Sequence, residues 1–251
     1  MMQPGPSQKG LIMKRKTLSA AAKLFLEYGY EGTSSRMVAD LLGVSSGSPF
    51  YQYGNKEGVL LEFTRRMFSN QFHAAEAIAG AGAISDPLGV YATETCLQLH
   101  IAEQSEQLRE LYVAAYTLPS PAMFIHKGML PKIAAIFGEF LPNQEEGTLF
   151  GLELAAAGVM RNFMVWPCTE TFTMEQKVGQ FLGSSFRIYG VPPERFRPIV
   201  MQMVQMDLAD LARHMIEETV RTADEEFEAA MEVKFEPKRY RSGVRETAEK
   251  K

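Results

Sequence analysis

The sequence predicts an all-α fold, and three observations predict it. Apolar residues recur at the helical spacing of three and four along almost every segment of the 251 residues. Strict alternation of apolar and polar residues between turn pairs, the pattern of a strand, is not found. Segments rich in proline and glycine separate the periodic stretches at intervals typical of helix lengths.

The first 80 residues predict four helices. An apolar stripe marks the first helix, and Gly29 is placed to end it in the left-handed conformation that glycine adopts readily. A second helix is expected from about Ser34 to Leu42, and a short third helix ends near Tyr53. The fourth helix, residues 55–79, links this head to the rest. The stripe of the first helix consists of Leu18, Ala21, Ala22 and Phe25.

The remaining helices predict a second domain, a helical bundle. The small residues of 80–85 indicate a boundary, and Asp86 followed by Pro87 is typical of a helix start. We therefore expect a disordered tail at 1–12, a DNA-binding domain at 13–60, a bundle at 86–232 and a charged tail at 233–251. The helices expected in the bundle are 87–104, 106–117, 121–140, 146–165, 173–189 and 194–231.

Charge is distributed unevenly between these domains. Residues 1–69 hold nine Lys and Arg against five Asp and Glu, although the whole chain carries a net charge of −4. A positive head on an acidic body suits a protein that approaches phosphates with one end. We expect a cytoplasmic protein without a membrane span, because the N-terminus lacks the pattern of a secretory signal and two cysteines do not form a disulfide framework.

The strongest local signal is the composition of a helix-turn-helix between Ser35 and Gln52. Ala39 is small enough for two helices to cross closely there. Gly43, four residues later, can adopt the positive φ of the turn, and Val44 supplies an apolar plug. An ordinary helical corner can carry the same fragment, so the flanking residues decide the interpretation.

Those flanking residues resemble the TetR family of bacterial regulators from Thr17 to about Leu61. The matching segments are Thr17 to Phe25, Gly29 to Ser35, Val38-Ala39, Gly43 to Gly47 and Asn55 to Leu60. This resemblance covers about a fifth of the chain. It implies a sequence-specific DNA-binding transcriptional regulator, a repressor that a small-molecule effector releases from a pseudo-palindromic operator.

The resemblance also implies which residues contact DNA. The start of the second helix would contact the DNA backbone, the next helix would face the bases, and Lys56 would hold a phosphate at a helix N-terminus. Two departures from the family pattern, Pro49 and Phe50, predict a short or shifted reading helix. The expected DNA-binding residues are Ser34, Ser35, Arg36, Ser45, Ser46, Gly47, Ser48, Phe50, Tyr51, Gln52 and Lys56.

The body is expected to form a homodimer. Residues 149–160 are rich in small side chains that allow close helix contact, and a later helix, either 173–189 or 194–231, would complete the interface. Intramolecular packing is the alternative for the same residues. The expected interface residues are Leu152, Ala155, Ala156, Val159, Met203 and Leu211.

A pocket for a small apolar or aromatic effector is the second expectation for the body. Residues 91–166 hold many Met and aromatic side chains, which suit an adaptable pocket but equally fill an ordinary bundle core. The expected pocket residues are His100, Tyr112, Tyr116, Phe124, Phe163 and Trp166.

Other functions are weaker interpretations. Cys96, His100 and Glu103 share one helix face, but such a trio lacks a fourth ligand, and we expect neither a metal nor another cofactor. The sequence shows no nucleophile paired with a base, so we do not predict an enzyme. The alternatives are a body that binds a protein partner, and an enzyme or lipid-binding protein with a vestigial head. The effector, the operator, the regulated genes and the sign of regulation do not follow from the sequence.

Overall fold

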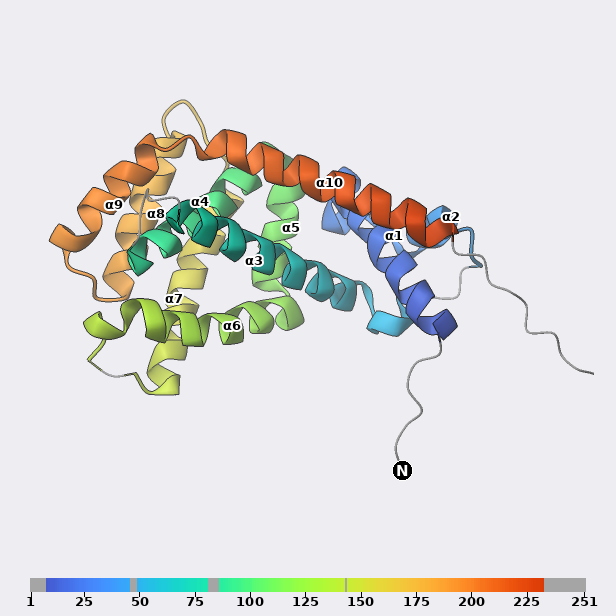
Figure 1. Ribbon diagram of the computed structural model, residues 1–251, viewed down its shortest axis with the longest axis horizontal. Helices are drawn as coiled ribbons and strands as arrows, with labels where there is room; N and C mark the ends of the chain where they lie inside the picture. The colour runs from blue at the N-terminus through green and yellow to red at the C-terminus, as the bar shows by residue number, and fades with distance from the viewer. Residues whose placement is uncertain (1–7, 46–48, 81–85, 143, 233–251) are drawn as a thin grey trace, which may run out of the picture.

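The computed structural model describes residues 8–45, 49–80, 86–142 and 144–232, and these form a helical protein with two parts (Figure 1). The head contains α1 (Gln8–Gly32), α2 (Ser35–Leu42), the 3-10 helix η1 (Tyr51–Tyr53) and the start of α3 (Lys56–Gly80). The body contains α4 (Pro87–Gln104), α5 (Glu106–Thr117), α6 (Pro119–Phe137), η2 (Gly138–Phe140), α7 (Glu146–Val165), α8 (Met174–Ile188), α9 (Pro193–Gln205) and α10 (Leu208–Glu232). Within the described ranges the only extended pairing is an isolated bridge between Thr169 and Phe172.

Capping side chains and a glycine that are visible in the sequence set several of the helix boundaries. The Ser34 hydroxyl accepts the backbone N–H of Met37 and caps α2, and the Asp86 carboxylate accepts the N–H of Leu88 and caps α4. Gly43 ends α2 with φ 62°. The predicted Asp86 cap and the predicted positive φ at Gly43 are confirmed, and α2 begins one residue after the expected start at Ser34. Gly29 also has a positive φ, 76°, and its non-helical conformation makes a kink in α1, after which a short helical segment extends to Gly32.

Two helix boundaries differ from the expectation. α1 begins at Gln8, so residues 8–12, expected in the tail, are helical. The expected helix 194–231 is two helices, because the chain turns at Met206 and Asp207 before α10 begins at Leu208. The Asp207 carboxylate accepts the N–H of Asp210 at 3.4 Å, which helps to begin the new helix.

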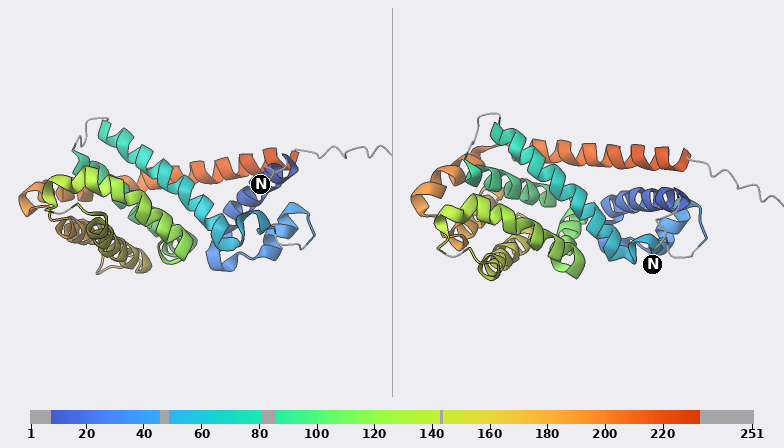
Figure 2. Two further views of the ribbon diagram at one scale, coloured as in Figure 1. Left: turned by 90° about the horizontal axis from the view of Figure 1, so that it is seen from below. Right: turned by 60° about the horizontal axis from the view of Figure 1, so that its bottom comes forward.

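The head and the body have separate apolar cores that meet along α1. The head core contains Phe25, Val38 and Phe50, and it also takes in Leu111 of α5 and Phe227 of α10. The body core contains residues from each of the helices α4 to α9, and it also takes in Phe72 of α3 and Ala212 of α10. α3 and α10 each run from the body to the head, so they span the junction (Figures 1 and 2).

Gly43 provides a test of the turn. Gly43→Ala should lower the free energy of unfolding by about 1–2 kcal/mol, because an alanine in the left-handed region is strained although its Cβ meets nothing within 4 Å. Gly128→Ala, in the interior of α6 with equal space around its Cβ, should instead raise it by about 0.5–1 kcal/mol. Urea unfolding measures both. Equal effects of the two substitutions would contradict the assigned turn.

Candidate DNA-binding surface and ligand cavities

The end of the head presents polar side chains on α2 and η1. Ser34, Ser35 and Arg36 are exposed at the start of α2, and Tyr51 and Gln52 are exposed on η1. The Tyr51 side chain is 85% exposed, which is unusual for a tyrosine and leaves the whole ring available to a partner. Arg36 is paired only loosely with Asp40, at 3.9 Å, so its guanidinium can reach a phosphate.

The turn between α2 and η1 is held by the buried small residues that the sequence indicated. Ala39 is 1% exposed where α2 packs on α1, and its carbonyl accepts the N–H of Val44 at 3.1 Å. Ser45, the next residue, is exposed. The expected base-facing residues Ser46, Gly47 and Ser48 lie outside the described residues.

Two of the expected DNA contacts are wrong. Phe50 is 2% exposed in the head core, because the aromatic ring packs inward where the family places a tyrosine. Lys56 does not point freely to solvent: its ammonium donates to the carbonyl oxygens of Tyr30 at 2.9 Å and Thr33 at 3.1 Å. It also lies 4.2 Å from the Tyr30 ring centroid. Lys56 therefore satisfies the carbonyl end of α1 instead of holding a phosphate.

Lys14 is a basic residue near η1 that the motif analysis did not select. Its ammonium lies 5.0 Å from the ring centroid of Tyr53, and the Tyr53 hydroxyl donates to the Lys14 carbonyl at 2.8 Å. Lys14 and Arg15 are both exposed. The cluster of Lys14, Arg15 and Lys16 in the sequence was the available signal, but only the fold brings it beside a segment 39 residues away.

A short helix, a glycine turn and an exposed polar segment on a helical body define the class of DNA-binding regulators with a helix-turn-helix head. Residues 18–63 match the family described as bacterial regulatory proteins, tetR family. Residues 18–63 are therefore similar to the DNA-binding domain of this family, as the sequence resemblance predicted.

The curated relatives have the name HTH-type transcriptional repressor AcnR. The relative from Corynebacterium diphtheriae is 32% identical over 82 residues, which are 32% of this chain and 42% of that protein. The relative from Corynebacterium glutamicum is 31% identical over 64 residues, 26% of this chain and 34% of that protein. The chain thus spans less than half the length of these relatives, which are regulators by name. No solved structure gives a significant match to the chain.

The six residues expected to line an effector pocket do not surround one cavity. Tyr112 lines a cleft at the head–body junction, whereas Tyr116 lines a cavity of about 20 Å³ in the body core. Phe163 packs against Phe172 and Phe181, and Trp166 is 69% exposed at the end of α7. His100 lines neither space, and Phe124 packs on Phe68. The expected pocket is therefore wrong as a set, because its residues lie in different environments: Phe124 and Phe163 pack against other rings, whereas Trp166 is exposed.

The small body cavity contains a buried polar network. The Glu94 carboxylate accepts from the Gln98 amide at 2.5 Å, and the Gln98 oxygen accepts from the Tyr116 hydroxyl at 2.8 Å. The second carboxylate, Glu153, accepts from the Tyr189 hydroxyl at 3.2 Å and lies 3.3 Å from a ring nitrogen of His126. The cavity has room for about one water molecule.

Burial decides the protonation of these carboxylates. Desolvation raises the pKa of Glu94 to about 7, an effect to which the neighbouring Glu153 adds, while the hydrogen bond from Gln98 and the positive Lys132 oppose it. Burial likewise raises the pKa of Glu153, against the effect of His126. At neutral pH the Glu94 carboxyl therefore lies close to a protonation change.

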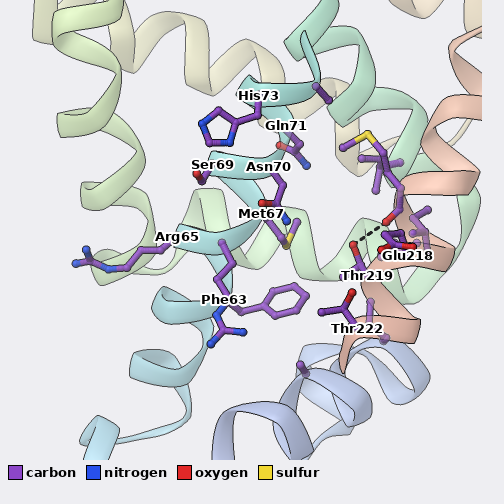
Figure 3. Close-up of a pocket in the computed structure, with 18 of the residues that line it drawn as sticks. Phe63, Arg65, Met67, Ser69, Asn70, Gln71, His73, Glu218, Thr219 and Thr222 are labelled. Carbon is purple, nitrogen blue, oxygen red and sulfur yellow. Dashed lines mark hydrogen bonds between the residues drawn. The ribbon is translucent and has the colours of Figure 1, made fainter. Parts of the chain in front are cut away.

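The larger space is a cleft of about 850 Å³ between α1, α3 and α10. Its apolar lining comes from both parts of the molecule, Leu18 and Ala22 from the head and Ile101, Leu108 and Met215 from the body. Figure 3 shows Phe63, Met67 and Asn70 pointing from α3 toward Thr219 and Thr222 of α10. Five helices contribute to this cleft, which explains why no sequence segment predicted it.

The expected dimer residues separate into three groups. Met203 is 1% exposed and Ala156 is 4% exposed, so both belong to the body core and were wrong as interface residues. Leu152, Val159 and Leu211 are partly buried against that core. Ala155 is exposed on the outer face of α7 with Gly151 and Leu154, and a Cβ built on Gly151 or Gly158 meets nothing within 4 Å.

Among the described residues α7 is long and apolar enough to cross a membrane by length and composition alone, although the sequence was expected to contain no such run. Its contacts with α5, α6 and α8, and the buried Glu153 at its centre, fit a bundle helix instead. Among the described residues no cluster of three metal-ligating side chains is found. Glu103 holds the buried Lys177 and accepts the N–H of Cys168 at 3.1 Å, so it is occupied by protein partners.

The buried network predicts a pH effect on stability. Because the pKa of Glu94 is higher in the folded state, only the unfolded chain loses this proton as pH rises from 4.5 toward 7, so stability falls over that interval. Glu94→Gln should flatten the decline, by up to about 3 kcal/mol between pH 4.5 and 8. Urea unfolding across this range measures it. The exposed Glu170→Gln should keep the wild-type decline, and a Glu94→Gln profile like the wild type would refute the assignment.

Proposed function

We propose that the chain is a TetR-type transcriptional repressor of the cytoplasm that binds a pseudo-palindromic operator as a homodimer. The observation that carries the proposal is the head, where Gly43 turns the chain between α2 and a segment with exposed Tyr51 and Gln52. Its match to the tetR family supports the proposal. The name of the AcnR relatives, transcriptional repressors, supports the sign of regulation.

In this proposal the head divides its contacts between phosphates and bases. Arg36 and Lys14 supply positive charge, which gives affinity without sequence preference. Tyr51 and Gln52 supply a hydroxyl and an amide, groups that can bond to base edges or to the backbone. The cationic side chains thus position the head, and the polar ones discriminate between sequences.

One head covers a half-site, so two copies are needed for a palindrome. We assign the contact between copies to the outer face of α7, where Gly151, Leu154 and Ala155 are exposed. Leu154 is 46% exposed, and the glycines beside it permit close approach of a second helix. This retains Ala155 from the sequence expectation and adds Leu154.

An effector would release the repressor only if it bound better to a conformation in which the two heads do not fit successive major grooves. The large cleft at the head–body junction favours a small molecule over a protein partner for this role, because a concave space of about 850 Å³ is within the range of ligand pockets.

The head is tested with DNA. Arg36→Ala should weaken binding to both the DNA flanking the gene and a random duplex, and should reduce the slope of log K against log salt by about one, because one phosphate contact is lost. Fluorescence anisotropy at several salt concentrations measures this. Arg213→Ala, an exposed arginine on α10, serves as the matched control. A wild-type protein that binds neither duplex would exclude the proposed function.

The dimer is tested separately. Ala155→Arg should convert the dimer to a monomer, since a charge placed in an apolar helix contact loses its water without gaining a partner. Sedimentation equilibrium measures the mass. Ala209→Arg, exposed on α10, should leave the dimer intact. If Ala155→Arg remains dimeric, another face joins the copies.

A further inference from the structure

The cleft between α1, α3 and α10 is lined by a buried side-chain amide of which one atom lacks a hydrogen-bond partner. Gln71 is 2% exposed and lines the cleft, and its amide nitrogen donates to the Tyr112 hydroxyl. Its amide oxygen has no hydrogen-bond partner among the described residues. Leaving such a group desolvated and unpaired is costly, so a partner that enters the cleft would be stabilised there.

The unpaired half of this amide indicates which chemical group would fit. As placed, Gln71 lacks a donor for its oxygen; with the amide turned over, the Tyr112 hydroxyl would donate to the oxygen and the nitrogen would lack an acceptor. A hydroxyl or an amide on the ligand satisfies both cases, because each can donate and accept. The apolar side chains of Leu108, Ile101 and Met67 line the same cleft.

Two ion pairs neutralise charged groups at the mouth of the cleft. Arg66 pairs with Glu226 at 2.8 Å, and Glu218 pairs with Arg221. Arg65, His73 and His214 also line the cleft. Figure 3 shows the Arg65 and His73 side chains leaving the side of α3 that faces away from α10, and a ring nitrogen of His214 lies 2.9 Å from the Asp210 carbonyl oxygen. A charged ligand would lose its hydration in the apolar interior without gaining an unpaired counter-charge, so an uncharged molecule is favoured.

We propose that this cleft binds an uncharged, largely apolar molecule with one hydroxyl or amide group, and that this molecule is the effector. The role of this molecule as effector rests on the proposed repressor function. Leu18 and Ala22 of the head and Met215 and Thr219 of the body line the same space. The ion pair of Lys23 with Asp224, at 2.8 Å, closes the same junction. A molecule held between these helices contacts both parts and therefore favours one position of the head.

The binding site is tested without DNA, with decan-1-ol as the probe and isothermal titration calorimetry of the purified full chain. Wild-type protein should bind decan-1-ol more tightly than decanoate or decylammonium. Gln71→Leu should weaken the binding of the alcohol about 5- to 10-fold, the effect of one lost hydrogen bond. Gln98→Leu, the matched change in the small body cavity, should leave it unchanged.

A second variant fills the space without touching the polar group. Thr222→Trp changes an exposed residue of α10 at the cleft, so the fold should persist by circular dichroism while decan-1-ol binding is lost. Binding that survives both Gln71→Leu and Thr222→Trp, or that Gln98→Leu abolishes instead, would overturn the site. Failure of the wild-type protein to bind decan-1-ol would overturn it as well.

The regulatory part is tested by adding decan-1-ol to the protein bound to the DNA flanking its gene. The alcohol should weaken this complex at least threefold for the wild type and should have no effect on Thr222→Trp. An unchanged complex would overturn the effector role while the calorimetry still decides the site. If the chain bound decan-1-ol but no DNA, the binding site would be supported and the proposed repressor function would be excluded.

Discussion

The packing of α1 against α5 and α10 is the constraint on which the rest of the structure depends. Leu111 of α5 and Phe227 of α10 enter the head core, so that core is incomplete without two body helices. Polar contacts fix the same junction: Glu110 of α5 accepts the N–H of Glu31, and Lys23 of α1 pairs with Asp224 of α10. The orientation of the DNA-binding surface is therefore set by the body.

The packing of α1 against α5 explains why residue 29, near the end of α1, is a glycine. A Cβ on Gly29 would collide with the Glu110 carboxylate, and its φ of 76° also favours glycine. The break lets the last turn of α1 face Glu110, while Lys56 of α3 takes the carbonyls of Tyr30 and Thr33. The last turn of α1 thus contacts both α5 and α3. Gly29 allows both contacts because it has no side chain.

Local signals predicted the fold where the chemistry is local. Gly43, Ser34 and Asp86 each act on backbone groups within four residues, so their effect can be read from the sequence. Phe50 and Lys56 could not be assigned in this way, because alignment with a motif gives a position but not the direction of a side chain. The break at residues 206–207 was hidden for a related reason, since the apolar spacing continues from α9 into α10.

The two cavities differ in what they can contribute to regulation. The body cavity is small and its carboxylates have protein partners, so the bundle around Glu94 and Glu153 is close-packed and resists change. The cleft at the junction is bordered by helices from both parts, and the ion pairs that span it lie at its exposed edge, where each is worth little. Breaking these exposed ion pairs therefore costs less than breaking the hydrogen bonds of the buried network in the bundle. A signal that moves the head is most easily generated at this junction, and the rigid body then provides the fixed frame against which two heads can be spaced.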